Sequence, residues 1–125
     1  MEFALVIPAA LALILCVLHM SFIVYGAVTL HFATEEEARC LSVSANNPPT
    51  ATTSCPNTDA TSVQTYGARM YQGPSINPTF SLGASAACTN GKQVTATGTY
   101  NMAMGVATIP FSLSAKSCFP YNYTS

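Results

Sequence analysis

The sequence predicts an α+β fold, in which a long N-terminal hydrophobic helix precedes a small disulfide-stapled domain with one short helix and a three-stranded antiparallel sheet. Three observations predict it. The first third of the chain is an uncharged apolar run, four of the five cysteines lie in the polar remainder, and the last third alternates apolar and polar residues around turn signals. We therefore divide the 125 residues into a long hydrophobic helix, residues 1–45, and an exterior domain, residues 46–125.

The apolar run is longer than a membrane requires. No Asp, Glu, Lys or Arg occurs from Phe3 to Thr34, a stretch of 32 residues. As one helix, this stretch would be about 48 Å long, whereas the hydrocarbon layer of a bilayer is about 30 Å thick. It also exceeds the apolar region of a secretory signal peptide. We expect the excess length to protrude from the bilayer or to pack against another surface.

The apolar run has no basic flank. Lys and Arg on the cytoplasmic side normally orient an inserted helix, but the first basic residue is Arg39. We expect that a basic leader preceded Met1 and was removed. The alternative is that Met1 is the true start and that insertion depends on hydrophobicity alone.

A few small and polar residues interrupt the run. Ser21, Tyr25 and Thr29 are spaced by four, so they share one helix face and are candidate helix-face contacts. Gly26 would allow a neighbouring helix to approach closely. These residues indicate a helix that packs against protein as well as lipid.

Neither the histidines nor the acidic run has the pattern of a metal site. His19 and His31 are twelve residues apart and do not share a helix face, so we expect each to be neutral and bonded to a nearby carbonyl. Residues 35–37 are consecutive glutamates, which splay around a helix, and Glu35 stands four residues before Arg39 in the favourable order. We expect a solvated helix face here.

The exterior domain begins with a loop, residues 46–57, whose Asn-Asn-Pro-Pro cluster ends the long helix. A short amphipathic helix is predicted over residues 59–72, capped by Thr58 or Asp59 and stopped by Gly73 and Pro74. Its apolar stripe consists of Val63, Tyr66 and Met70.

Three antiparallel strands are predicted at about residues 79–88, 93–101 and 108–118. Asn90-Gly91 is a hairpin signal between the first two. Alternate residues of each strand are apolar, which gives the sheet one apolar face. The short helix and the end of the long helix can cover this face. Its residues are Phe80, Leu82, Ala84, Val94, Ala96, Tyr100, Ile109, Phe111, Leu113 and Ala115.

The cysteines predict two disulfides in an oxidising compartment. Cys16 lies in the apolar run and is expected to be a small buried hydrophobe. The other four contain no CxxC or CxxCH spacing, so they support neither a zinc site nor attached haem. In an up-down-up meander, Cys118 returns to the sheet end that holds Cys88. Geometry therefore favours Cys88–Cys118 and leaves Cys40–Cys55.

Composition argues against several functions. With only four Lys and Arg, the chain lacks the basic clusters that bind phosphate backbones, so no nucleic-acid partner is expected. No nucleophile elbow, P-loop, metal motif or paired carboxylates occur, and both histidines lie in the apolar helix. We expect neither an enzyme nor a cofactor.

The chain resembles the TadE-like family, pilin-like proteins of tight-adherence systems that are related in build to type IV pilins. The matching features are "EFALV" from Glu2 and Phe3 onward, then Pro8, the apolar run and the helix exit "ATEEEARCLSV" ending in Ala38-Arg39. The later stretches "QVTATGTY" and "IPFSLSAKSCF" resemble the two late strands of the family.

The resemblance implies a precursor that a prepilin-type peptidase cuts and that its first helix holds in the inner membrane. Pilus assembly machinery would then build it into an extracellular filament on the cell surface, a homopolymer with a core of such helices. By analogy with type IV pilins, Glu2 would meet the terminal amine of a neighbouring subunit. This acidic residue usually stands a few positions further from the cleavage point than in this chain.

Three functions remain open from the sequence. The chain is either a structural filament subunit, a minor membrane-anchored pseudopilin that assists or primes pilus assembly, or an anchored adhesive module. The candidate exposed aromatics of an adhesive module are Tyr66, Tyr71, Tyr121 and Tyr123, and packing within the sheet or a subunit contact is the alternative role for them.

Glu2 and Pro8 each have a simpler alternative. Glu2 can lie near lipid headgroups, favoured by the helix dipole, or it can be a charge that needs a partner in an apolar filament core. Pro8 can be harmless in the first helical turns, where amides are unbonded anyway, or it can kink the helix as it leaves lipid. For Pro8 we favour the harmless placement.

Overall fold

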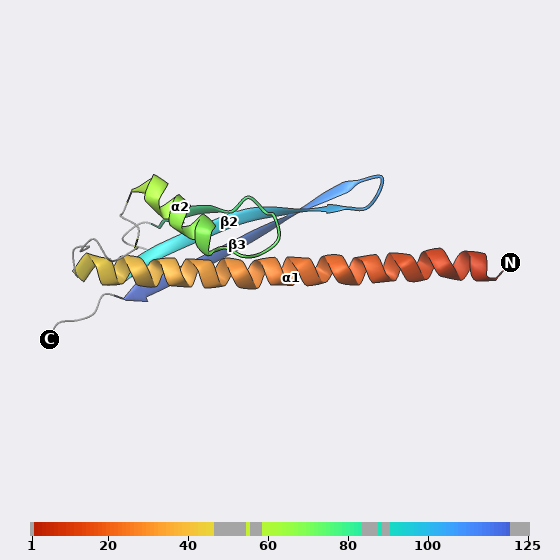
Figure 1. The fold of residues 1–125 in the computed structure, drawn as a ribbon, viewed down its shortest axis with the longest axis horizontal. Coiled ribbons are helices and arrows are strands. Elements are labelled where there is room, and N and C mark those ends of the chain that lie inside the picture. The colour runs from red at the N-terminus through yellow and green to blue at the C-terminus, as the bar shows by residue number, and fades with distance from the viewer. Residues whose placement is uncertain (1, 47–54, 56–58, 84–87, 89–90, 121–125) are drawn as a thin grey trace.

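The computed structural model describes residues 2–46, 55, 59–83, 88 and 91–120. Helix α1 forms a rod, the domain lies along the part of it that is further from the N-terminus, and the β2–β3 hairpin reaches past its midpoint (Figure 1). The elements are α1 (Phe3–Asn46), α2 (Ala60–Met70), β1 (Thr79–Leu82), β2 (Gly91–Ala103) and β3 (Thr108–Pro120). This arrangement confirms the predicted α+β fold, with a long first helix, one short helix and three strands.

The sheet is an antiparallel meander in the order β1-β2-β3. β2 and β3 pair along their whole length, from Gly91 opposite Pro120 to Ala103 opposite Thr108. β1 is much shorter and covers only one end of β2, from Thr79 opposite Thr97 to Leu82 opposite Val94. The other end of the β2–β3 hairpin therefore extends beyond β1 as a two-stranded ribbon.

The connection between β1 and β2 differs from the predicted two-residue turn. A turn at Asn90-Gly91 would place Leu82 opposite Thr99, but its partner is Val94. β1 ends at Leu82 instead of residue 88, and Gly91 is already the first residue of β2. A Cβ at Gly91 would collide with the carbonyl oxygen of Phe119, so this glycine serves close strand approach. Residues 84–87 and 89–90 lie outside the described residues.

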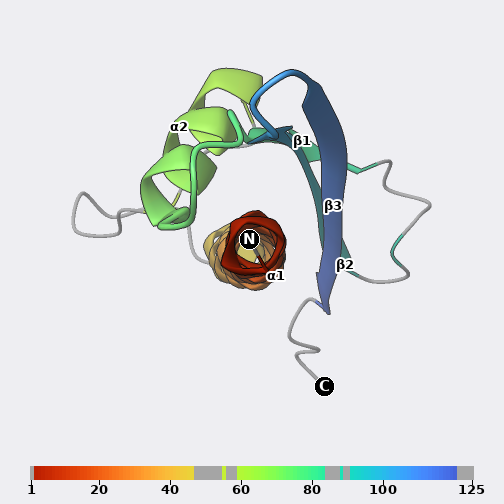
Figure 2. The ribbon, with the colours of Figure 1, turned by 90° about the vertical axis from the view of Figure 1, so that its right-hand side faces the viewer.

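The core lies between α1, α2 and one face of the sheet, and α2 and the sheet curve around α1 (Figure 2). Helix α1 contributes a stripe of buried residues at three- and four-residue spacing, which is one face of a helix. The predicted apolar face of the sheet supplies the side of the core that lies opposite α1. The buried cluster consists of Leu30, Ala33, Ala38, Leu41, Val63, Ile76, Phe80, Val94, Ala96 and Ala115.

Helix α2 is three residues shorter than the predicted span of residues 59–72. Asp59 is its N-cap residue, although its side chain makes no capping hydrogen bond. The Gln64 side chain ties α2 to β1, because its Nε2 donates to the Pro78 carbonyl (2.8 Å) and its Oε1 accepts from the Phe80 amide (2.6 Å). These bonds, together with the burial of Val63, fix α2 over the sheet.

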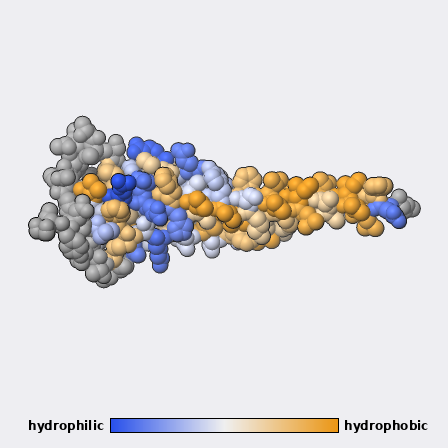
Figure 3. All heavy atoms as spheres, turned by 90° about the horizontal axis from the view of Figure 1, so that it is seen from below, coloured by the Kyte–Doolittle hydropathy of each residue, from blue (hydrophilic) through white to orange (hydrophobic). Residues whose placement is uncertain are grey.

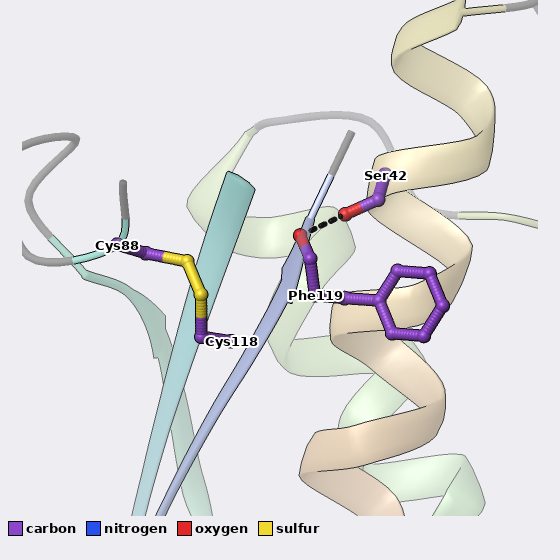
Figure 4. Close-up of a disulfide and its surroundings, with 4 residues drawn as sticks. All are labelled: Ser42, Cys88, Cys118 and Phe119. Carbon is purple, nitrogen blue, oxygen red and sulfur yellow. Dashed lines mark hydrogen bonds between the residues drawn. A yellow bond between two sulfur atoms is a disulfide. The ribbon is translucent and has the colours of Figure 1, made fainter. Parts of the chain in front are cut away.

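Both predicted disulfides are confirmed. Cys40 pairs with Cys55, with Cα atoms 5.4 Å apart, and Cys88 pairs with Cys118, with Cα atoms 5.9 Å apart. Next to the second bridge, the Ser42 hydroxyl donates to the Phe119 carbonyl at 2.8 Å (Figure 4). The end of β3 is thus fastened to α1 on one side and to the β1–β2 connection on the other.

We predict that Gly67→Ala destabilises the domain by about 1–3 kcal/mol, as overpacking does. The added Cβ would lie within 3 Å of the Phe80 ring. Alanine's greater helix propensity would by itself stabilise α2 by about 1 kcal/mol, so a net loss reports the steric clash. Near-UV circular dichroism of tyrosines during thermal unfolding in detergent measures it. The control is Ala68→Ser, an equally small addition at the exposed neighbouring position; equal stability of both variants would contradict this packing.

Candidate functional site: the exposed surface of helix α1

The first half of α1 is largely bare, and its start is bare on every side. All residues from Phe3 to Leu15 are exposed, and Phe3 and Leu5 each retain 80% of their accessible surface. In Figure 3 apolar atoms cover the rod where it leaves the domain. Water-soluble monomers rarely leave a contiguous apolar surface of this extent. This surface is therefore the strongest candidate site for contact with lipid or with other protein chains.

The second half of α1 is covered by its own domain. Partial burial begins at Cys16, and Gly26 is the first fully buried position. A Cβ on Gly26 would lie 3.2 Å from Pro74 Cγ and 3.3 Å from a Leu113 methyl group. This corrects the expectation for Gly26: its missing side chain admits the chain's own loop and β3, because the domain folds back over this face.

The polar face of α1 is largely satisfied within the chain. The Ser21 hydroxyl donates to the Val17 carbonyl (2.9 Å), and the Thr29 hydroxyl lies within bonding distance of two carbonyls of the preceding turn. Tyr25 reaches the loop that follows α2, because its hydroxyl donates to the Gln72 carbonyl at 2.9 Å. The predicted helix-face contacts thus include one that fastens α1 to the loop after α2.

Glu2 and Phe3 stand at the exposed tip of the rod, where α1 begins at Phe3. Pro8 lies inside the helix, which continues through it. Because α1 starts at Phe3, Pro8 lies beyond the first four amides, which have no intrahelical partner. It therefore removes the amide that would bond the Ala4 carbonyl, so the expectation of a cost-free placement is corrected.

His19 joins α1 to the β2–β3 hairpin. Its Nδ1 lies 3.1 Å from the Tyr100 hydroxyl, and the two rings are 6.3 Å apart between centroids. The predicted carbonyl partner is thus replaced by a tyrosine from a strand 81 residues later. His31 is exposed. No group of three metal-ligating side chains occurs within the described part of the chain.

An open apolar surface follows one face of α1 from Cys16 to Val28. Cys16 lies half-buried beside it with a free thiol, which corrects the expectation that this residue is buried. The lining residues are Cys16, Val17, Met20, Ser21, Val24, Tyr25 and Val28.

Glu37 is the residue that sequence reasoning missed. The expected solvated face holds for Glu35, which is exposed, whereas Glu37 is fully buried. Neither carboxylate oxygen has a hydrogen-bond partner among the described residues. Burial raises the pKa of Glu37 to about 8. The signal was available, since Glu37 continues the spacing of buried Leu30, Ala33 and Leu41 along α1.

The candidate adhesive tyrosines are only partly accessible. Tyr66 and Tyr71 are both half-buried, and burial is the main cause that raises the pKa of each phenol. The Tyr71 hydroxyl donates to the Pro74 carbonyl at 2.7 Å, and the Arg69 guanidinium lies 5.5 Å from the centre of the Tyr66 ring. Tyr121 and Tyr123 lie outside the described residues. The two described tyrosines thus pack in the domain.

Comparisons with protein-family models, with characterised proteins and with solved structures found no match to this chain. By length and composition, α1 is able to cross a membrane, in the stretch Phe3–Val43. From Gly26 onward the domain covers one side of α1. The bare part that precedes this cover is thus the part compatible with membrane anchoring.

We predict that Glu37 makes the domain less stable as pH rises. In the unfolded chain the carboxyl loses its proton near pH 4.5, whereas the folded state keeps it until about pH 8. Between these values the folded state binds more protons, so its stability falls by up to about 1.4 kcal/mol per pH unit. Above pH 8 the loss levels off.

Glu37→Gln removes this titration, so the variant should gain stability over the wild type progressively from pH 5 to pH 8. Thermal unfolding in detergent at several pH values measures the difference. Glu35→Gln is the matched control, because Glu35 is exposed on the same helix, and it should keep the wild-type pH profile. Parallel profiles for Glu37→Gln and the wild type would contradict a buried neutral carboxyl.

Proposed function

We propose that this chain is a structural subunit of an extracellular pilus-like filament, which polymerises through α1 after removal of a leader. The observation that supports this proposal is the bare apolar half of α1, which projects from a compact domain. A surface of this kind must be covered by lipid or protein, and repeated copies of the same rod are the simplest protein cover.

The dimensions of α1 favour protein cover in the final state. Its 44 residues correspond to about 66 Å, about twice the thickness of a bilayer's hydrocarbon layer. The domain occupies only one side of the covered half, and exposed apolar side chains continue there at Val28 and Phe32. A head-to-tail contact that does not close into a ring would cover these surfaces by forming a helical polymer.

The further parts of the proposal rest on the resemblance to the TadE-like family. Before assembly, α1 would anchor the subunit in the inner membrane, and a prepilin-type peptidase and the pilus assembly machinery would act on it. A minor pseudopilin has the same sequence features. Mass spectrometry of sheared surface filaments separates the two roles, because a structural subunit is abundant in that material and a priming subunit is not.

We predict that Leu13→Ala and Phe22→Ala abolish or strongly shorten filaments while leaving membrane insertion intact. In a packed helix bundle, truncating such a side chain leaves a cavity that costs about 2–5 kcal/mol, whereas fluid lipid chains fill the space. Both side chains are exposed in the subunit, so its own fold is unaffected.

Electron microscopy of the sheared fraction measures the filaments, and carbonate extraction of membranes measures insertion. Thr97→Ala, on the exposed side of β2, is the control and should assemble normally. Filaments of normal length from both α1 variants would argue that lipid alone covers this surface.

We predict that Glu2→Gln blocks filament assembly and retains membrane insertion. A carboxylate in an apolar core is costly unless a positive group pairs with it, and the proposed partner is the terminal amine of a neighbouring subunit. Glu35→Gln, which removes an exposed carboxylate at the covered end of α1, should assemble normally. Filaments from Glu2→Gln in wild-type amounts would contradict the proposed pairing of the Glu2 carboxylate with the terminal amine of a neighbouring subunit.

A further inference from the structure

The tip of the β2–β3 hairpin, residues 103–109, exposes apolar side chains that the domain does not use. Val106 retains its whole accessible surface (103%), Met104 45% and Ile109 41%. The tip lies in a long stretch without charge, since no Asp, Glu, Lys or Arg occurs between Lys92 and Lys116. Exposed apolar side chains on an uncharged protrusion need a partner that is not water.

The hairpin tip points toward the same end of the molecule as the bare half of α1 (Figure 1). Contacts along the two elements fix this direction. Ser42 bonds the Phe119 carbonyl near one end of α1, and His19 bonds Tyr100 far along it toward the N-terminus. The tip continues past Tyr100 in the same direction. It therefore lies alongside the part of α1 that is N-terminal to His19.

A membrane span that starts at Phe3 brings the level of the tip into the bilayer. Crossing roughly 30 Å of hydrocarbon takes about 20 residues of helix, so such a span reaches past His19. The level of His19 and Tyr100 then lies close to the membrane surface. The tip starts near that level and extends further toward the membrane centre.

Polar side chains mark the same level on both elements. On α1 it is marked by His19 and Ser21, and on the hairpin by the Tyr100 hydroxyl and the exposed side chains of Asn101 and Ser112. Tyrosine is enriched at this depth in membrane proteins, because its ring is apolar and its hydroxyl is wet. These polar side chains mark a shared level, although exposed apolar side chains continue past it on α1, at Phe22 and Val24.

We propose that the hairpin tip is a second membrane-contacting element, which enters the lipid leaflet next to the domain beside α1. The proposal rests on the membrane-anchored state that the proposed function assigns to the subunit before assembly. The partner is lipid, because the tip is fixed to α1 through Tyr100 and His19 and follows α1 into any bilayer. A contact with a second copy would require a further arrangement of subunits.

The backbone of the tip suits a shallow position. In hydrocarbon, unbonded amides and carbonyls are costly, so open strand edges do not lie deep in a membrane. The turn satisfies part of its own backbone, as the Met104 amide donates to the Ala107 carbonyl (2.8 Å) and the Val106 amide to the Met104 carbonyl (2.9 Å). Pro110, at the edge strand β3, has no amide to satisfy. We therefore place the tip about 5–10 Å deep, as for interfacial elements.

Tryptophan fluorescence tests this placement, because the chain contains no Trp. Three single variants of the full chain are compared in vesicles of phosphatidylethanolamine and phosphatidylglycerol doped with lipid brominated near the glycerol end of its acyl chains. Val106→Trp reports the tip, and Ile14→Trp reports insertion of α1. Ser114→Trp, on the exposed side of β3 away from the tip, is the control.

The expected result is blue-shifted emission and quenching by brominated lipid for Val106→Trp and Ile14→Trp, with neither for Ser114→Trp. The signal of Val106→Trp should not change when protein is diluted in lipid. Met104→Trp, at another exposed tip position, should repeat the result if Val106→Trp folds poorly.

Three outcomes would overturn the proposal. Iodide quenching of Val106→Trp equal to that of Ser114→Trp would place the tip in water. A blue shift that disappears on dilution in lipid would identify another copy of the chain as the partner. Absence of quenching by brominated lipid at Ile14→Trp would show that α1 is not inserted in the bilayer, so the tip would have no anchor beside it. Failure of filament assembly would leave the tip result unchanged, so the two proposals are tested separately.

Discussion

The packing of the domain around the second half of α1 is the contact on which the rest of the structure depends. A buried stripe from Gly26 to Ser42 holds the sheet and α2 against the helix. Everything N-terminal to this stripe has little or no cover within its own chain. The same contact thus makes a stable domain and leaves a bare rod, because the domain is too short to follow the helix to its start.

This contact also accounts for the unusual position of Glu37. A side chain on the buried stripe cannot reach water when the domain closes over it, so its carboxyl stays protonated up to about pH 8. The neighbouring Glu35 stays in water, although it is only two positions away. The helix places the two carboxyl groups on different faces, and the domain covers only one of them.

Much of this fold follows from local sequence patterns. The apolar run predicts α1, the alternation in residues 108–118 predicts β3, and the meander geometry predicts the pairing of Cys88 with Cys118. The β1–β2 connection could not be predicted in this way, and for Glu37 the helical spacing alone did not show which face of α1 the domain covers. Each depends on which surfaces meet in three dimensions: Gly91 serves a contact with Phe119, and Glu37 lies on the face of α1 that the domain covers.

The direction of the hairpin has a mechanical consequence. β2 and β3 run roughly along the axis of α1 (Figure 1), and their ladder hydrogen bonds lie perpendicular to the strands. A force that slides one of these strands past the other along the rod would therefore load the paired residues from Gly91–Pro120 to Ala103–Thr108 in shear, all at the same time. Strands pulled apart from one end would instead separate pair by pair. The hairpin thus resists sliding of its strands best along the axis of α1.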